Sequence, residues 1–407
     1  MKKYFRLSLL SSALIGFAIS SFAQKNPVIV GGVKNTPDYE NITTGADRTQ
    51  AYLPLLKGKR VALLVNQTSE INGVLLPDTL LKRGVNIVKI FSPEHGFRGH
   101  ADAGAKVKSG IDKETGLQVI SLYGSNKKPT ADQLKDVDIV VYDLQDVGAR
   151  FYTYINTLQY LMEACAEQKK QVIVLDRPNP LGFIIDGPVL DKKHATFVGM
   201  QAIPVIHGMT VGEYAKMLMG EKWLKSTSPK LTVITCENYT HQSLYKLPAM
   251  PSPNLKNMSA IYLYPSLCLF EGTKASLGRG TSYPFQQFGH PDLKKSYTHT
   301  FTPVSMEGAT DPPLKNQKCY GVMVADNDYK ALRVSDSKLN LKWIIEAYNN
   351  YPKKDEFFIP FFEKLSGTDK LRAQIKAGVS EADIRKSWQP ELDKFKTIRK
   401  KYLLYAE

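Results

Sequence analysis

The stretch from residue 59 to residue 91, KRVALLVNQTSEINGVLLPDTLLKRGVNIVKIF, decides the fold class. Residues 61–65 form a continuous apolar run, which is typical of a strand buried on both faces. Residues 75–83 can supply a following helix that ends at Gly84, and residues 85–91 predict the next strand. A strand, a helix and a second strand in this order predict a βαβ unit with two parallel strands.

The same alternation continues along the first half of the chain. Residues 151–170 carry apolar side chains at three- and four-residue steps, which predicts a helix. Thr210 followed by Glu213 is a capping-box pattern that predicts another helix over residues 210–224. Further strands are predicted at residues 118–123, 138–143, 171–176 and 231–235. These segments indicate the α/β class, with a mostly parallel sheet.

The composition changes after about residue 240. Prolines and glycines punctuate residues 248–284, which predicts a loop-rich region. A strand-like run at residues 320–324 follows, and then helical patterns at residues 340–349, 369–377 and 381–404. A chain of 407 residues also exceeds the about 250–300 residues at which a single core stops growing. We therefore predict a first domain over residues 24–240 and a smaller α+β auxiliary domain over residues 241–407.

The first 23 residues have the pattern of a secretory signal peptide. Lys2, Lys3 and Arg6 precede an apolar core, and Ser21-Phe22-Ala23 resembles a cleavage site. The apolar core is shorter than the about 18 residues of a membrane-spanning helix, and no later stretch approaches that length. We expect an exported protein, periplasmic or secreted and without stable membrane insertion, and a retained membrane anchor is the alternative.

The chain is strongly basic, with a formal net charge of +15 at pH 7. Removal of the predicted signal peptide lowers that charge by three, because it contains three basic residues and no acid. A basic balance favours anionic polymers such as an acidic glycan or nucleic acid. The basic residues are spread along the sequence and form no recognisable nucleic-acid-binding module, so we do not expect nucleic acid as the partner.

Several motifs that would indicate a cofactor or a metal are missing from the sequence. No G-x-G-x-x-G follows the first strand, and neither a P-loop nor a G-x-S-x-G motif occurs. His95, His100 and His207 lack metal-ligand spacing. The cysteines are far apart and are expected to be buried free thiols: Cys165, Cys236, Cys268 and Cys319. We therefore predict no metal and no cofactor.

Polar residues follow each predicted buried strand of the first domain. Because the carboxyl ends of parallel strands meet at one edge of a sheet, where ligands bind, these residues are expected to converge. Polar loops that begin at strand ends for structural reasons alone are the alternative. The residues singled out are Asn66, Glu94, His95, Asp143, Asp146, Arg150, Arg177 and Asn179.

The segment SPEHGFRG at residues 92–99 brings together an acid, an imidazole and a guanidinium. Glu94 is well placed for acid/base chemistry at a strand end, or it pairs with Arg98. In FEGTKASLGRGT, residues 270–281, Glu271 and Arg279 either pair with each other or offer Arg279 to a ligand carboxylate.

Two further residues have a structural alternative beside a binding role. Asn254 follows the rigid turn Pro251-Ser252-Pro253, which can present it to sugar hydroxyls. His207 precedes a predicted helix, where it holds a loop or contacts substrate.

Several strings taken together resemble the exo-β-N-acetylmuramidase family, the NamZ-type glycoside hydrolases. They are FSPEHGFRG, VVYDLQDVGARFYTYI, VLDRPNPLG, HGMTVGEYA, PSPN and EGTKASLGRGT. The resemblance runs from about residue 41 to the C-terminal residues. It implies a Rossmann-like catalytic domain, an auxiliary C-terminal domain and an active site in the cleft between them. It also implies release of terminal N-acetylmuramic acid from the non-reducing end of peptidoglycan fragments, with Glu94 as the catalytic carboxylate and His95 beside it.

Glycoside hydrolysis usually needs a second group beside the acid. Asp143, Asp146 and Glu271 are the candidates, and the two aspartates are preferred for their strand-end position. The chain departs from the family pattern at residues 274–277, Lys-Ala-Ser-Leu, where Asn-x-Ser-Glu is usual. This departure removes an acid from the expected cleft loop.

N-Acetylmuramic acid also carries a lactyl carboxylate, which calls for a cation. The arginines that can supply one are Arg98, Arg150, Arg177 and Arg279. The expected partners are MurNAc-GlcNAc oligosaccharides or muropeptides. A non-catalytic muropeptide- or sugar-binding protein and a metal-dependent amidase are the competing hypotheses.

Overall fold

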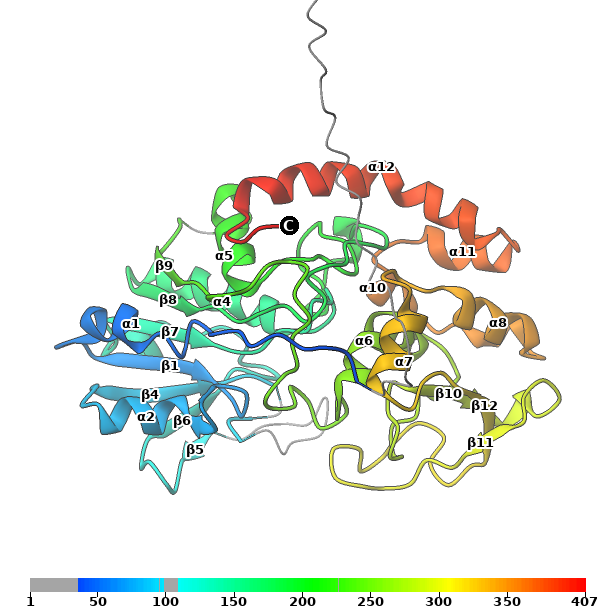
Figure 1. Ribbon diagram of the computed structural model, residues 1–407, viewed down its shortest axis with the longest axis horizontal. Coiled ribbons are helices and arrows are strands. Elements are labelled where there is room, and N and C mark those ends of the chain that lie inside the picture. The colour runs from blue at the N-terminus through cyan, green and yellow to red at the C-terminus, as the bar shows by residue number, and fades with distance from the viewer. Residues whose placement is uncertain (1–35, 95, 99–108, 226) are drawn as a thin grey trace, which may run out of the picture. The chain divides into compact units, whose positions relative to one another are not determined.

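The computed structural model describes residues 36–94, 96–98, 109–225 and 227–407 (Figure 1). The predicted signal peptide, His95 and His100 lie outside these residues. A seven-stranded sheet has the order β5-β6-β4-β1-β7-β8-β9. Its strands are β1 (Val61–Val65), β4 (Ile87–Ser92), β5 (Gly110–Ile111), β6 (Gln118–Ser121), β7 (Ile139–Asp143), β8 (Gln171–Leu175) and β9 (Lys230–Ile234).

The sheet is parallel except at the edge strand β5, which pairs antiparallel with β6. The predicted mostly parallel sheet is therefore confirmed. From β1 the chain proceeds to β4 on one side, and after β6 it crosses to β7 on the other side of β1. Such a reversal opens a crevice at the carboxyl ends of the strands, which is where ligands bind in open α/β sheets.

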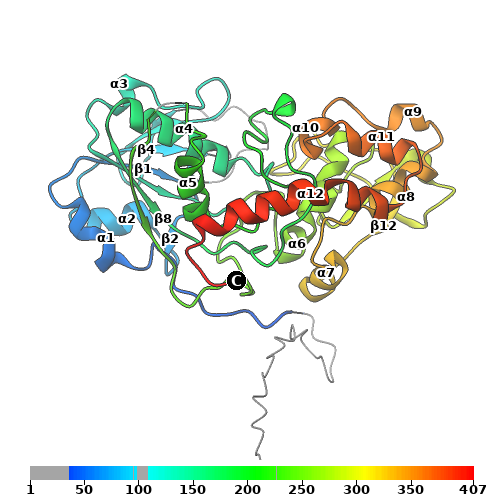
Figure 2. The ribbon, with the colours of Figure 1, turned by 90° about the horizontal axis from the view of Figure 1, so that it is seen from above.

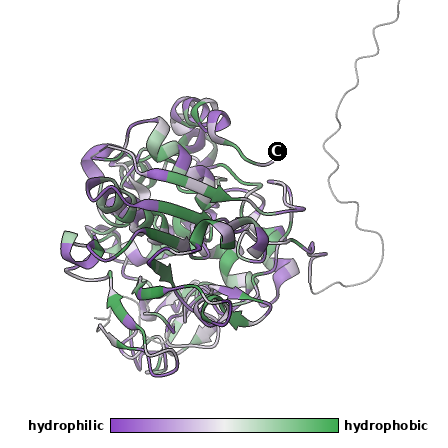
Figure 3. Ribbon diagram, turned by 90° about the vertical axis from the view of Figure 1, so that its left-hand side faces the viewer, coloured by the Kyte–Doolittle hydropathy of each residue, from purple (hydrophilic) through white to green (hydrophobic). Residues whose placement is uncertain are grey.

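Alternate side chains of the central strands point to opposite faces of the sheet. Ala62 and Leu64 share one apolar cluster with residues of α4 (Tyr154–Glu167) and α5 (Val211–Gly220). Val61 and Leu63 share another with residues of α1 (Thr49–Leu56) and α2 (Leu76–Lys82). Burial on both faces explains why these strands are continuous apolar runs, and Figure 3 colours the strands of this sheet mostly as hydrophobic.

The predicted capping box at the start of α5 is confirmed. The Thr210 hydroxyl accepts a hydrogen bond from the Glu213 amide, and the Glu213 carboxylate accepts one from the Thr210 amide. Figure 2 shows α4 and α5 lying over the strands of the large sheet. The short helix α3 (Ala131–Leu134) begins with a second capping box, formed by Thr130 and Gln133.

The second half contains a three-stranded antiparallel sheet with the order β10-β12-β11. Its strands are β10 (Gln287–His290), β11 (His299–Phe301) and β12 (Cys319–Met323). A separate hairpin in the first half pairs β2 (Glu70–Ile71) with β3 (Val74–Leu75). The helices of the second half are α6 (Met258–Leu267), α7 (Asp328–Ser335), α8 (Lys342–Asn350), α9 (Lys354–Phe357), α10 (Phe362–Ser366), α11 (Lys370–Lys376) and α12 (Glu381–Arg399).

Helix α6 corrects the prediction of a loop-rich region over residues 248–284. All ten of its residues are buried, including Pro265. A helix that is apolar on every side shows no amphipathic period, so its sequence gives no helical signal. Asn257 caps it by accepting a hydrogen bond from the Ala260 amide.

The C-terminal segment returns to the first half of the chain. Figure 1 shows α12 running from beside α11 toward α5. Beyond α12, the Leu404 amide donates to Glu213 and the Tyr405 hydroxyl donates to Asp176 at 2.7 Å. One apolar core also includes buried residues from both halves. The boundary between residues 240 and 241 stays a prediction.

All four cysteines are free and buried, as predicted. Within the described part of the chain, no helix is both long enough and apolar enough to cross a bilayer.

Candidate active site

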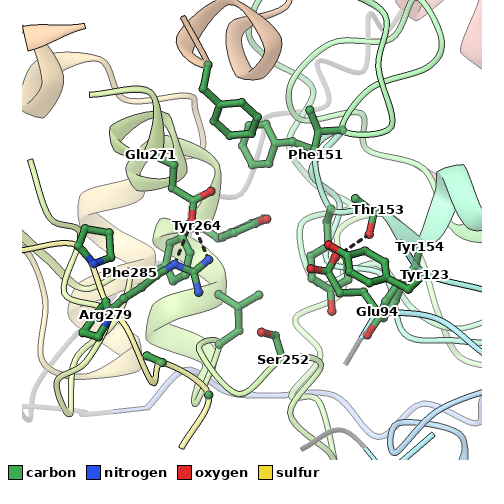
Figure 4. Close-up of a pocket in the computed structure, with 18 of the residues that line it drawn as sticks. Glu94, Tyr123, Phe151, Thr153, Tyr154, Ser252, Tyr264, Glu271, Arg279 and Phe285 are labelled. Atoms are coloured by element: carbon green, nitrogen blue, oxygen red, sulfur yellow. Dashed lines mark hydrogen bonds and ion pairs between the residues drawn. The ribbon is translucent and has the colours of Figure 1, made fainter. Parts of the chain in front are cut away.

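A cavity of about 660 Å³ lies at the carboxyl edge of the large sheet. One wall comes from the segments that follow β4, β6 and β7, and contains Glu94, Tyr123 and Thr153. The facing wall comes from the second half of the chain and contains Glu271 and Arg279. Figure 4 shows these two polar groups across the cavity from each other.

Glu94 stands three residues beyond Phe91 and belongs to the loop after β4. The Thr153 hydroxyl donates to its Oε2 atom at 3.2 Å. Burial, together with the charge of Glu94 and a hydrogen bond to it, raises the pKa of the Tyr123 phenol above its ordinary value. Tyr123 therefore stays protonated and donates to the carboxylate, so that one hydroxyl from the segment after β6 and one from the start of α4 orient Glu94.

Two tyrosines join this wall to the turn at Pro251. The hydroxyls of Tyr152 and Tyr154 donate to the Pro251 carbonyl at 2.8 and 3.2 Å. The Asn66 side chain donates to the Tyr154 hydroxyl at 2.8 Å. Asn66 was predicted to bind substrate, but it does not line the cavity. It instead fixes Tyr154, which does line the cavity.

Glu271 and Arg279 form an ion pair on the facing wall, which confirms the structural alternative for these residues. The Nε and Nη2 atoms of Arg279 donate to Oε1 of Glu271 at 3.0 and 2.6 Å. The guanidinium also lies over the ring of Phe285, at 4.9 Å from its centroid. Both residues line the cavity, so the pair remains open to a ligand.

The loop that carries Arg279 requires the glycines on either side of it. Gly278 and Gly280 have φ values of +86° and +77°, which other residues rarely adopt. A Cβ atom at Gly280 would lie 2.5 Å from Pro312. These two positions therefore hold the guanidinium at the cavity.

Among the described residues, the carboxylates in the cavity lining are Glu94, Glu271 and Asp311. The Asp311 side chain is 91% exposed and lies 3.6 Å from Lys315. Asp311 therefore belongs to the rim, whereas Glu94 and Glu271 are partly buried in the facing walls.

Asp143 does not occupy the place expected for a second catalytic carboxylate. Its two oxygens accept from Nε and Nη2 of Arg177 at 2.5 and 2.9 Å, and both side chains are almost completely buried. Burial lowers the pKa of Arg177, but the Asp143 charge outweighs that effect, so the net shift is upward and the arginine stays charged. Neither residue lines the cavity, so the pair is structural.

Asp146 and His207 are likewise buried outside the cavity lining. Asp146 accepts a hydrogen bond from the Gly148 amide at 2.7 Å. The Nδ1 atom of His207 accepts from the Met209 amide, and its Nε2 atom lies 3.5 Å from Asp146. Asp146 therefore lies outside the cavity lining, and its catalytic role stays a prediction. The hydrogen bond that His207 accepts fits the alternative in which it holds a loop.

Three more expected binding residues hold the backbone instead. The Arg150 guanidinium donates to the carbonyls of residues 188, 203 and 365 at 2.8 Å each, and burial lowers its pKa to about 9. Asn179 donates to the Met209 carbonyl and Asn254 donates to the Gly308 carbonyl. These residues are buried and lie outside the cavity lining.

Arg98 lies beyond Glu94 on the same loop but pairs with other carboxylates. Its guanidinium contacts Asp112 at 2.9 Å and Glu114 at 3.1 Å. Its hydrogen bonds and those of Thr115 lower the pKa of Asp112, although burial opposes that shift. His95 lies outside the described residues.

Thr153 and Ser252 line the cavity and are not among the predicted site residues. Tyr123, one of several aromatics whose faces suit sugar rings, lines it as well. Tyr123 follows the strand at residues 118–121 just as Glu94 follows β4. This position just beyond a strand is the sequence signal that could have identified Tyr123 as a candidate site residue. A tyrosine is, however, often largely buried in a core, and Thr153 carries no motif of its own, so the sequence singles out neither residue.

The described residues contain no cluster of three or more histidine, cysteine, aspartate or glutamate side chains arranged to hold a metal ion. The cavity instead offers a carboxylate held by hydroxyl donors and, opposite it, a guanidinium paired with a second carboxylate. Aromatic rings of Tyr264 and Phe285 complete the lining. Such an arrangement suits a polar ligand that carries an anionic group.

Comparisons with known proteins agree along most of the chain. The family profile described as exo-β-N-acetylmuramidase NamZ, N-terminal, matches residues 61–259, and the C-terminal profile of the same family matches residues 262–405. The peptidoglycan β-N-acetylmuramidase NamZ of Bacillus subtilis is 38% identical, over 91% of this chain and 94% of that protein.

Two solved structures from Bacteroides fragilis, both described as DUF1343 family proteins, have the same fold. One has a TM-score of 0.83 and 47% identity, over 90% of this chain and 100% of that chain. The other has a TM-score of 0.76 and 31% identity, over 89% and 99%. With both family profiles and a curated relative matched, the chain belongs to the exo-β-N-acetylmuramidase NamZ family and is a glycosidase.

Proposed function

We propose that this protein is an exo-acting glycoside hydrolase that releases terminal β-linked N-acetylmuramic acid from the non-reducing end of peptidoglycan fragments. The observation that carries the proposal is the cavity in which Glu94 faces the Arg279–Glu271 pair. The Bacillus subtilis relative, named as a peptidoglycan β-N-acetylmuramidase, supports the same substrate.

Glu94 is the proposed general acid. It gives its proton to the glycosidic oxygen while the bond between that oxygen and the anomeric carbon breaks. The leaving sugar departs with a hydroxyl group. Tyr123 and Thr153 hold the Glu94 carboxyl group in place during this transfer.

Glu271 is the proposed second carboxylate, since Asp143 and Asp146 lie outside the cavity lining. Water adds its oxygen to the anomeric carbon, and Glu271 takes the proton that this water loses. Arg279 holds the Glu271 side chain in place through two hydrogen bonds to its Oε1 atom.

Arg279 is also the proposed contact for the lactyl carboxylate of the terminal sugar. In the described residues its Nη1 atom has no hydrogen-bond partner, whereas Nε and Nη2 are held by Glu271. A guanidinium can serve two carboxylates at once because it has five N–H donors. This contact separates N-acetylmuramic acid from N-acetylglucosamine, which lacks the lactyl group.

The proposed substrates are MurNAc-GlcNAc oligosaccharides or muropeptides, and no cofactor enters the proposed steps. Export by the leader at residues 1–23, to the periplasm or the medium, agrees with such a substrate. The basic net charge of the chain also favours an acidic glycan.

The experiment that tests the proposal is incubation of the purified protein with peptidoglycan fragments whose non-reducing ends are N-acetylmuramic acid. Free N-acetylmuramic acid should accumulate, and fragments that end in N-acetylglucosamine should stay intact. Binding of the fragments without any release would favour the non-catalytic binding protein. Release that a chelator abolishes would favour a metal-dependent hydrolase.

A further inference from the structure

A second cavity, of about 410 Å³, adjoins the first. Ser252 lines both cavities, and Glu307 of the second is followed by Gly308 of the first. Arg98, four residues beyond Glu94, lines the second cavity as well. Gln67 and Arg98 of its lining come from the first half of the chain, which carries the proposed acid, and its other lining residues come from the second half.

Lys256 also lines this second cavity, and among the described residues no carboxylate forms an ion pair with it. Arg98 also lines it, but Asp112 and Glu114 already pair with that guanidinium. Lys256 is exposed, and among the described residues its ammonium group has one polar contact, with the Met306 sulfur at 3.8 Å.

Gln67 adds a polar group to the same lining. Its Nε2 atom donates to the carbonyls of Met250 and Pro251 at 3.0 and 3.2 Å, which fixes the side-chain amide. Its Oε1 atom is buried and has no hydrogen-bond partner among the described residues. Buried polar atoms normally have a partner, so this oxygen is able to accept a hydrogen bond from a ligand hydroxyl. Glu307 is the carboxylate of the cavity.

We propose that the second cavity binds the leaving-group side of the glycan, beyond the scissile bond, and that Lys256 contacts a carboxylate carried there. This inference rests on the proposed function. The acid that protonates a leaving oxygen must lie beside the leaving group, and Arg98, four residues beyond Glu94, lines the second cavity. The terminal sugar then lies between Glu94 and Arg279, and the rest of the chain passes Ser252 into the second cavity.

The carboxylate has two sources in peptidoglycan fragments. It is the lactyl carboxylate of the next N-acetylmuramic acid where that sugar is peptide-free. Where a stem peptide is attached, that lactyl group is an amide and the carboxylates belong to the peptide. A trisaccharide MurNAc-GlcNAc-MurNAc without peptide and the same trisaccharide with a peptide on its last sugar distinguish the two sources.

The test compares KM values for the disaccharide MurNAc-GlcNAc and for both trisaccharides. Lys256→Met should raise the KM of at least one trisaccharide about two- to fivefold more than the KM of the disaccharide, which is the range that an exposed ion pair supports. Lys256→Glu should enlarge that difference, and high salt should abolish it in the wild type. Lys394→Met is the matched control, since Lys394 lies on α12 and lines neither cavity.

If Lys256→Met raises the KM for the peptide-free trisaccharide, the contact belongs to the lactyl group. If it raises the KM only for the peptide-bearing trisaccharide, the contact belongs to the peptide. An equal effect of Lys256→Met on the disaccharide and both trisaccharides, or no effect on any, would overturn the inference while leaving the proposed function intact. If the wild type cleaves none of the three substrates, the proposed function itself fails.

Discussion

The guanidinium of Arg279 donates to Glu271 through Nε and Nη2 at 3.0 and 2.6 Å, on the cavity wall that faces Glu94. This ion pair brings a charged donor into the cavity without leaving its charge uncompensated. It also fixes the position of a second carboxylate across the cavity from the proposed acid.

Replacement of Arg279 by Met should weaken binding of the muramic acid substrate. The loss of a hydrogen bond to a charged group costs about 1.5–3 kcal/mol, which corresponds to an about 10- to 150-fold lower kcat/KM. Arg279→Lys should recover part of this loss, because it restores the charge without the planar fork. Parallel assays with N-acetylmuraminide and N-acetylglucosaminide substrates check the role. A variant that keeps the full preference for the muraminide would contradict it.

Tyr123→Phe should lower kcat by about tenfold while KM changes little, because the lost hydroxyl orients Glu94 and not the sugar. Steady-state kinetics with one chromogenic muraminide measure both constants. Thr153→Val should have a similar but smaller effect, and Thr153→Ser, which keeps the hydroxyl that donates to Glu94, is the matched control. An unchanged kcat for Tyr123→Phe would remove the positioning role from this tyrosine.

The ion pair between Asp143 and Arg177 should govern stability and not chemistry. Asp143→Asn leaves a buried guanidinium without its counterion, which should lower the free energy of unfolding by about 3–5 kcal/mol. Chemical denaturation measures this loss. The double variant Asp143→Asn with Arg177→Met should be more stable than the single one, because it no longer contains an unpaired buried charge. A fully stable but inactive Asp143→Asn protein would return Asp143 to the catalytic candidates.

Asp176 should make the stability depend on pH. Burial raises its pKa to about 6, although hydrogen bonds from Tyr405 and Thr210 oppose that shift. The pKa of an aspartate in the unfolded chain is about 3.9. Between about pH 4 and pH 6 the native state therefore binds more protons than the unfolded state. The free energy of unfolding falls as the pH rises through this range and is constant above it.

Asp176→Asn should abolish this dependence, so that the variant gains up to about 3 kcal/mol relative to the wild type between pH 4 and pH 7. Urea denaturation at several pH values measures the difference. Asp393→Asn, at an exposed position of α12, is the control and should leave the profile unchanged. Parallel profiles of the wild type and Asp176→Asn would contradict the assignment.

Local patterns predicted most of the large sheet. Continuous apolar runs such as residues 61–65 can be buried on both faces only in a covered parallel sheet, so they determined strand and fold class together. Helix α5 was predicted as well, because its capping box is a local signal. Helix α6 could not be predicted, since it is buried on every side and its apolar residues have no helical period.

The site was only partly predictable for a related reason. The strand-end rule brought Glu94 and Asp143 to the same sheet edge, but it gave no information on which of the two would meet a buried arginine. The pairing of Asp143 with Arg177 joins residues 34 positions apart and depends on the adjacency of β7 and β8. Glu271 and Arg279, eight positions apart in one glycine-rich loop, were recognisable as a pair.

The most direct test of the account is the turnover of a chromogenic β-N-acetylmuraminide by the wild type and by Glu94→Gln, with the matching N-acetylglucosaminide as the control substrate. The account predicts release from the muraminide alone, and an about 100- to 10,000-fold lower kcat in Glu94→Gln with an unchanged free energy of unfolding. Full activity of a folded Glu94→Gln protein, or no wild-type release despite intact binding of the muraminide, would contradict it.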